Sequence, residues 1–136
     1  EMGASMDIFP TFIKAAGGDP SKYEIDGKDI MPMIARGQPT PHTEIFWEQG
    51  NQLAVRQGKW KLVLNGQLVE YESPPEPVHL ANLEQDIGEK VNLKDKHPEK
   101  TKELTEMAKS WYEKVESRWQ KEFNSEQNGT TGFTQK

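Results

Sequence analysis

The stretch TEIFWEQGNQLAVRQGKWKLVLNGQLVEYE, residues 43–72, decides the fold. Its three glycines, Gly50, Gly58 and Gly66, lie eight residues apart, and segments that mostly alternate apolar with polar residues separate them. A strand of five or six residues followed by a two-residue turn has this spacing. Asn65-Gly66 is the strongest turn signal, because a type I′ turn needs positive φ at both central residues. The stretch therefore predicts a four-stranded antiparallel meander.

Alternation within these strands assigns their side chains to the two faces of the sheet. One face holds Leu53 and Val55 in the second strand and Trp60, Leu62 and Leu64 in the third. Antiparallel sheets commonly bury one face and leave the other partly in contact with water. We therefore expect one face of the meander to need a covering element.

Helical patterns lie on both sides of the predicted sheet. Residues 7–16 (DIFPTFIKAA) indicate a short helix that ends at Gly17-Gly18. Its N-cap is expected at Met6 or Asp7, because Pro10 is tolerated only in the first turn. After the sheet, residues 73–77 (SPPEP) disfavour regular structure, and residues 78–80 are expected to form a short strand.

A longer helix is predicted to begin at His97-Pro98, because proline fits the first helical position. An apolar stripe follows at spacings of three and four residues, which predicts one face of about five helical turns. The simplest covering for the one-sided sheet is this amphipathic helix, so the fold class is α+β. The stripe consists of Leu104, Met107, Ala108, Trp111, Val115 and Trp119.

The bulk properties exclude several classes of protein. The chain has 136 residues and a formal net charge of −5, which disfavours a nucleic-acid partner or an anionic membrane surface. No apolar run is long enough to span a bilayer. The absence of cysteine excludes disulfides, thiolate zinc sites and a cysteine nucleophile within this chain. Because the chain begins at Glu1, already close to a helix, we expect it to be a piece of a longer protein.

No nucleophilic or metal-binding constellation appears in the sequence. The three histidines, His42, His79 and His97, do not lie at metal-ligand spacing from one another. His42, just before the first strand, is the one that could contact a ligand, whereas His79 and His97 are better explained as structural. Two carboxylate pairs could face a cation, although turn-forming roles explain them more simply. These pairs are Asp26 with Asp29 and Asp86 with Glu89.

Two further groups of side chains could bind a ligand. Four aromatic residues could stack on a sugar or partner, although aromatic residues on a small sheet more often fill its core. They are Trp47, Trp60, Tyr71 and Trp111. A small basic group of Arg56, Lys59 and Lys61 could steer an anionic substrate, and a solvated strand face explains it as well. From these residues alone, the chain is not predicted to be an autonomous enzyme.

Four motifs, in order, give the chain a resemblance to the C-terminal end of sulfatases, sulfuric ester hydrolases of the alkaline-phosphatase superfamily. The resemblance reaches to about Trp119, with departures at Ile87, where the family has proline, and at His79 and Ala81, which replace tyrosine and aspartate. The motifs are MDIFPT at 6–11 with Ala16-Gly17, IDGKDI at 25–30, AVRQGKWKL at 54–62, and residues 80–93 followed by His97-Pro98-Glu99.

The resemblance implies a role for the chain and a location for the chemistry. Sulfatases use a formylglycine made from Cys or Ser in a C/S-x-P-x-R motif, together with Asp and Asn residues that bind calcium. These groups lie in the large N-terminal domain, so no catalytic or metal-binding residue carries over to this chain. The C-terminal subdomain is implied to pack its sheet and helix against that catalytic domain and to lend loops to the pocket rim.

We therefore expect residues 1–37 to end the catalytic domain, residues 38–123 to form the C-terminal subdomain, and residues 124–136 to be a polar, disordered tail. The resemblance implies a parent that hydrolyses sulfate esters, with sulfated sugars as candidate substrates, and the fragment alone is predicted to be inactive. His42, Trp47 and Arg56 are the residues expected to contact substrate at the rim. The family resemblance alone suggests a periplasmic or secreted protein.

Three alternatives remain open at this point. A phosphonate or phosphodiester hydrolase of the same superfamily could carry a similar tail. A free-standing module could use Trp47 and the basic group to hold anionic glycans. The chain could also dimerise through the bare apolar face of the first helix, an artefact of truncation. The partner expected for that face is the missing catalytic domain.

Overall fold

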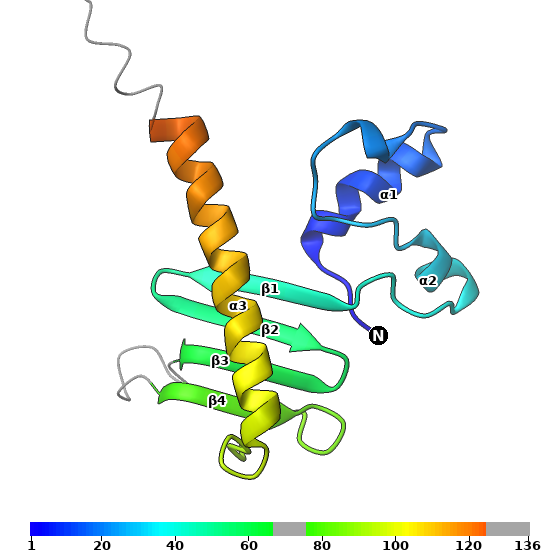
Figure 1. Cartoon of the computed structure of the whole chain (residues 1–136). Helices are drawn as coiled ribbons and strands as arrows, with labels where there is room; N and C mark the ends of the chain where they lie inside the picture. The colour runs from blue at the N-terminus through cyan, green and yellow to red at the C-terminus, as the bar shows by residue number, and fades with distance from the viewer. Residues whose placement is uncertain (67–75, 125–136) are drawn as a thin grey trace, which may run out of the picture. The chain divides into compact units, whose positions relative to one another are not determined.

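The computed structural model describes residues 1–66 and 76–124 (Figure 1). The chain divides into two compact units. Unit 1 comprises Glu1–Ile45 and Arg56–Gly58, and unit 2 comprises Phe46–Val55 and Lys59–Lys136.

Four strands form one antiparallel sheet, which confirms the predicted fold class. The strand order β1-β2-β3-β4 is that of a meander. Gly50 (φ 61°) and Gly58 (φ 56°) supply the left-handed backbone at the first two turns, as the sequence predicted. The strands are β1 (Glu44–Gln49), β2 (Gln52–Gln57), β3 (Trp60–Gly66) and β4 (Glu76–Asn82).

The turn predicted at Asn65-Gly66 is wrong. Gly66 is a strand residue that pairs with Glu76, and β3 runs antiparallel to β4 without a break in register from Trp60 to Gly66. Asn65 adopts the left-handed conformation (φ 54°) inside β3. The register places it opposite Pro77, which has no N–H to donate to β3, so the hydrogen-bond ladder is already interrupted where Asn65 is irregular.

The fourth strand of the sheet is therefore β4, which begins at Glu76 and includes Pro77 of the stretch expected to lack regular structure. The short strand expected at 78–80 is confirmed, although it is longer than predicted. The strand expected at 67–72 falls outside the described residues, as does Tyr71.

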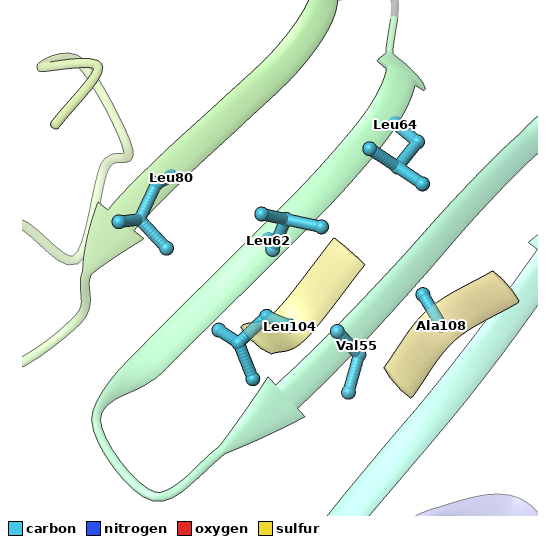
Figure 2. Packing of buried hydrophobic residues seen from close by; sticks show 6 residues of the cluster. All are labelled: Val55, Leu62, Leu64, Leu80, Leu104 and Ala108. Atoms are coloured by element: carbon cyan, nitrogen blue, oxygen red, sulfur yellow. The ribbon is translucent and has the colours of Figure 1, made fainter. Parts of the chain in front are cut away.

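Helix α3 (Pro98–Trp119) covers one face of the sheet, and it begins where the sequence predicted. Figure 1 shows it crossing the strands, and Figure 2 shows the side chains that meet there. Leu62, Leu80 and Leu104 are completely buried in this cluster. Partly buried side chains surround it, among them Trp60 and Met107. The cluster consists of Val55, Leu62, Leu64, Leu80, Leu104 and Ala108.

The apolar stripe of α3 is buried only along the first part of the helix. Trp111 stacks on Phe46 with ring centroids 5.1 Å apart, which supports the interpretation of Trp111 as a packing residue. Farther along, Val115 is 36% and Trp119 52% exposed, so the expected burial does not extend over the whole stripe. The helix continues as the π-helical segment η3 (Gln120–Asn124). None of the helices in the described ranges is long and apolar enough to cross a bilayer.

Unit 1 consists mainly of short helices. The N-cap of α1 is Asp7, as predicted, and Gly17 (φ 78°) follows the helix in the left-handed conformation. Pro10 lies in the first turn of α1, where its missing N–H leaves no hydrogen bond unmade. The helices are η1 (Ser5–Asp7), α1 (Ile8–Ala15), η2 (Pro20–Lys22) and α2 (Met31–Arg36).

Truncation of Leu104 should destabilise unit 2, because its side chain is completely buried between α3 and the sheet. We expect Leu104→Ala to lower the free energy of unfolding by about 3 kcal/mol, the loss typical of a large-to-small change in a core. Urea denaturation followed by Trp fluorescence measures this. Val115→Ala on the same helix is the matched control and should change it by less than about 1 kcal/mol. Equal losses for the two variants would contradict the packing of α3 described here.

Candidate functional site

The three residues expected at the rim lie in different surroundings. His42 is buried in unit 1, whereas Trp47, on β1 in unit 2, is 42% exposed. Arg56 belongs to unit 1 and donates a hydrogen bond from Nε to the carbonyl of Gly58, at 3.1 Å. Within unit 1, His42 and Arg56 have different partners, Asp7 and the carbonyl of Gly58.

His42 pairs with Asp7, a residue that sequence reasoning identified only as a helix cap. The Nε2 atom of His42 lies 2.8 Å from Oδ1 of Asp7, and both side chains are almost completely buried. The same carboxylate accepts hydrogen bonds from the backbone N–H of Ala4 and of Lys28, each at 2.8 Å. Asp7 therefore joins the start of unit 1, the loop before α2 and the segment that leads into β1.

The hydrogen bonds to Asp7 keep its carboxylate ionised. Burial is the largest single influence on the pKa of Asp7 and acts to raise it. The backbone N–H groups of Ala4 and Lys28 and the His42 side chain together outweigh burial, so the pKa lies below its ordinary value. The Asp7 carboxylate is buried, and both of its oxygens form hydrogen bonds. We therefore interpret the Asp7–His42 pair as a structural contact that fixes the position of His42.

A second group of polar side chains lines a cleft in unit 2, which we call the β3–β4 cleft. It has a volume of about 320 Å³. Lys61 and Val63 of β3 alternate with the buried leucines, and His79 of β4 pairs with Val63, so this cleft lies on the sheet face opposite α3. The described residues that line it are Gln52, Lys61, Val63, Gly66, Glu76, His79, Gly88 and Glu89.

Ion pairs hold two of the three residues of the predicted basic group. Lys61 Nζ lies 2.6 Å from Glu89 Oε1, and Lys59 Nζ lies 3.9 Å from Glu84 Oε2. Glu89, which sequence reasoning proposed as a cation ligand with Asp86, is therefore paired with a lysine. Among residues 1–66 and 76–124, no group of three His, Asp or Glu side chains could hold a metal ion.

Asn92 is a positioning residue that the sequence analysis did not single out. Its side-chain amide donates to the carbonyl of Val78, at 2.8 Å, and to Glu76. Its side-chain oxygen accepts from the N–H of Leu80, at 3.1 Å, so Asn92 covers part of the open edge of β4. In the sequence, Asn92 is marked only by its place in the motif at residues 80–93. That motif does not indicate which residues Asn92 contacts.

Comparisons with known proteins identify the relatives of this chain. No protein-family model matches it. Bovine arylsulfatase A is 30% identical over 129 residues, a match that covers 80% of this chain and 25% of the relative. Mouse N-acetylgalactosamine-6-sulfatase is 40% identical over 63 residues, covering 45% of this chain and 12% of the relative. The chain is similar to a portion of each of these sulfatases.

Solved structures agree with this result. A Bacteroides thetaiotaomicron protein described under the metabolism of multiple glycosaminoglycans matches with a TM-score of 0.60 and 26% identity. The match covers 76% of this chain and 24% of that protein. The structure described as Ps i-CgsB matches with a TM-score of 0.59 over 77% of this chain and 23% of that one; at 21% identity it shows a shared fold alone. The chain thus spans about a quarter of the length of these proteins.

Asp7→Asn should weaken the hydrogen bonds that hold the segments of unit 1 together. In the wild type, the N–H groups of Ala4 and Lys28 each donate to a different oxygen of Asp7, whereas asparagine has only one side-chain oxygen. We expect the amides of Ala4 and Lys28 to exchange hydrogen about tenfold faster at neutral pH, a loss typical of one buried hydrogen bond. The low pKa of Asp7 gives the sign of the pH dependence. The difference from the wild type is present above pH about 4 and shrinks as the pH falls through the folded-state pKa.

Asp19→Asn is the matched control, since Asp19 is exposed and its side chain accepts only a local hydrogen bond from Ser21. It should leave exchange at Ala4 and Lys28 unchanged. An Asp7→Asn protein whose exchange rates match those of the control would show that the buried pair does not join these segments.

Proposed function

We propose that this chain is the C-terminal portion of a sulfatase that hydrolyses sulfate esters of sulfated sugars, and that it supplies scaffold and pocket rim. The names of the relatives support the reaction class, and two of those names include a sugar. The mouse relative acts, by its name, on an N-acetylgalactosamine 6-sulfate, and the Bacteroides protein is described under glycosaminoglycan metabolism.

The observation that carries the proposal is the bare apolar face of α1 in unit 1. Ile8 and Phe9 are each 53% exposed and Phe12 is 66% exposed. They line an open apolar groove of about 610 Å³ together with Met6 and Ile13. Contiguous exposed apolar surface of this kind marks an interaction site. Because the chain covers 25% of bovine arylsulfatase A, we assign this face to the rest of the parent protein.

The chemistry is assigned to the same missing part of the parent. The family resemblance implies a formylglycine and calcium, and among the described residues no three His, Asp or Glu side chains converge to hold a metal ion. Of the rim candidates, Trp47 offers exposed aromatic surface that could contact a sugar. His42 is enclosed, so its role at a rim would be to position the segment that leads into β1.

The test is to express the chain alone and joined to its upstream coding sequence, and to assay both with an aryl sulfate and an aryl phosphodiester. We expect the joined protein to hydrolyse the sulfate ester and the chain alone to hydrolyse neither substrate. Turnover by the chain alone would overturn the proposed role. Preference of the joined protein for the phosphodiester would instead favour the phosphodiesterase alternative.

The assignment of the α1 face gives a prediction with two readouts. In the isolated chain, Phe12→Ser should change the stability by less than about 0.5 kcal/mol, because the side chain is already exposed. In the joined parent, the same change should lower the melting temperature by several degrees, because a buried Phe contributes about 3 kcal/mol or more. Differential scanning calorimetry measures both.

Lys14→Ser, at an exposed position of the same helix, is the control and should leave both proteins unchanged. If Phe12→Ser and Lys14→Ser have the same effect in the parent, the apolar face of α1 is not where the rest of the protein packs.

A further inference from the structure

The outer edge of β4 is closed by the side chain of Asn92 and the backbone of Leu93, which we call the edge cap. β4 is the last strand of the sheet, so backbone groups that point away from β3 face no further strand. The N–H of Leu80 donates to Oδ1 of Asn92, at 3.1 Å, and its carbonyl accepts from the N–H of Leu93, at 2.8 Å. Nδ2 of Asn92 donates to the carbonyl of Val78, at 2.8 Å. The carboxamide of Asn92 therefore binds β4 as a peptide group of a fifth strand would.

An uncapped edge would be a template for strand addition. A row of unpaired N–H and carbonyl groups at the edge of a sheet can pair with a strand of another chain. Val78 and Leu80 direct such groups to the outer side of β4, since both bond to Asn92. Pro77 does not interrupt this row, because backbone groups alternate in direction along a strand and its missing N–H lies on the side of β3.

Glu76 holds the carboxamide of Asn92 in place. Its Oε1 accepts from Nδ2 of Asn92, and its Oε2 lies 2.7 Å from Nδ1 of His79. The hydrogen bond from His79 is the largest influence on the pKa of Glu76 and lowers it; burial opposes this, and the hydrogen bond from Asn92 lowers it further. The carboxylate is therefore ionised at neutral pH and can only accept, so it orients Nδ2 of Asn92 toward itself and leaves Oδ1 for Leu80.

We propose that the edge cap is an autoinhibitory contact: it prevents β4 from pairing with β4 of a second copy of this chain, and Glu76 keeps it in place. A second copy fits because the outer side of β4 is self-complementary. A two-fold axis at His79 places Val78 of one copy opposite Leu80 of the other, so that four hydrogen bonds form between N–H and carbonyl groups. Residues 77–81 contain no Asp, Glu, Lys or Arg, so no fixed like charges oppose each other in this register.

The experiment compares the wild-type chain with Asn92→Ala by nuclear magnetic resonance at neutral pH. It needs no substrate, so its outcome does not depend on the proposed function. At about 0.05 mM protein, the Leu80 amide of the variant should exchange hydrogen about tenfold faster than in the wild type, the effect of one lost hydrogen bond. The amide of Leu62 should stay slow in both proteins, which shows that the sheet remains folded.

At higher concentration the uncapped edge should produce dimers. Four exposed backbone hydrogen bonds suggest a dissociation constant on the order of 1 mM. Between about 0.05 and 1 mM protein, translational diffusion of Asn92→Ala should therefore slow more steeply than that of the wild type. Asn51→Ala is the matched control, since Asn51 lies exposed in the turn between β1 and β2. It should exchange and diffuse as the wild type does.

Two double variants identify the surface that dimerises. Val78→Pro in the Asn92→Ala background removes an N–H from the outer side of β4, where proline is tolerated, and it should restore the diffusion of the wild type. Phe12→Ser in the same background changes the exposed apolar face of α1 and should leave the dimer intact.

If Asn92→Ala does not fold, Glu76→Gln provides the test, because it leaves one acceptor oxygen for two donors that now use two. It should also accelerate exchange at Leu80 and promote dimerisation. Glu84→Gln is its control, since the Glu84 side chain is 72% exposed, and it should change neither property.

Three results would overturn the proposal. Unchanged exchange at Leu80 in Asn92→Ala would show that Asn92 does not cap the edge. Faster exchange without any dimer would show that the uncapped edge does not accept a second copy. A dimer that survives Val78→Pro or is lost with Phe12→Ser would show that the copies pair through a surface other than β4.

Discussion

Leu62 of β3 and Leu80 of β4 lie opposite each other beneath Leu104 of α3, and all three side chains are completely buried (Figure 2). This layer fixes the register of the two strands, because a shift by one residue would turn every side chain of a strand to the other face. The same register pairs Val63 with His79 on the opposite face. The packing of the leucines therefore also creates the polar cleft in which His79 lies.

The alternating pattern of residues 43–66 predicted the first three strands and their buried face, and the apolar stripe that follows Pro98 predicted the helix that covers it. The regular spacing of the glycines led to one wrong prediction, the turn at Asn65-Gly66. Asn65-Gly66 has the composition of a hairpin turn, yet Asn65 takes the left-handed conformation within β3, and Gly66 still pairs with Glu76. The register explains this, since it places Asn65 opposite Pro77, whose missing N–H already interrupts the hydrogen-bond ladder between β3 and β4.

The two buried histidine–carboxylate pairs could not be predicted from the sequence. The residues of one pair are far apart in the chain, and those of the other lie in a stretch that was not expected to form a strand. Asp7 and His42 are separated by 35 residues, and no local pattern links a helix cap to a histidine that precedes a strand. Glu76 and His79 are close in sequence, but Glu76 lies among prolines that disfavoured a strand assignment. Only the observed strand places the two side chains together beside Asn92. The expectation that His42, Trp47 and Arg56 contact substrate stays a prediction.

The two units differ in how completely they bury their own apolar surface. Unit 2 encloses a core between sheet and helix, whereas unit 1 exposes Ile8, Phe9 and Phe12 on one helix. This difference is expected if the chain is one portion of a longer sulfatase, in which unit 1 packs against protein that lies outside this chain. The relatives, of which it covers about a quarter or less, are consistent with that arrangement.

Hydrogen exchange of the amides in α1 and in β3, compared between the isolated chain and the same chain joined to its upstream sequence, tests this account most directly. The account predicts that the amides of α1 exchange at least about tenfold more slowly in the joined protein, because burial suppresses local opening. Those of Leu62 and Leu80 should be protected in both proteins. Identical rates in α1 with and without the upstream sequence would contradict the claim that the exposed face of unit 1 belongs against the rest of a sulfatase.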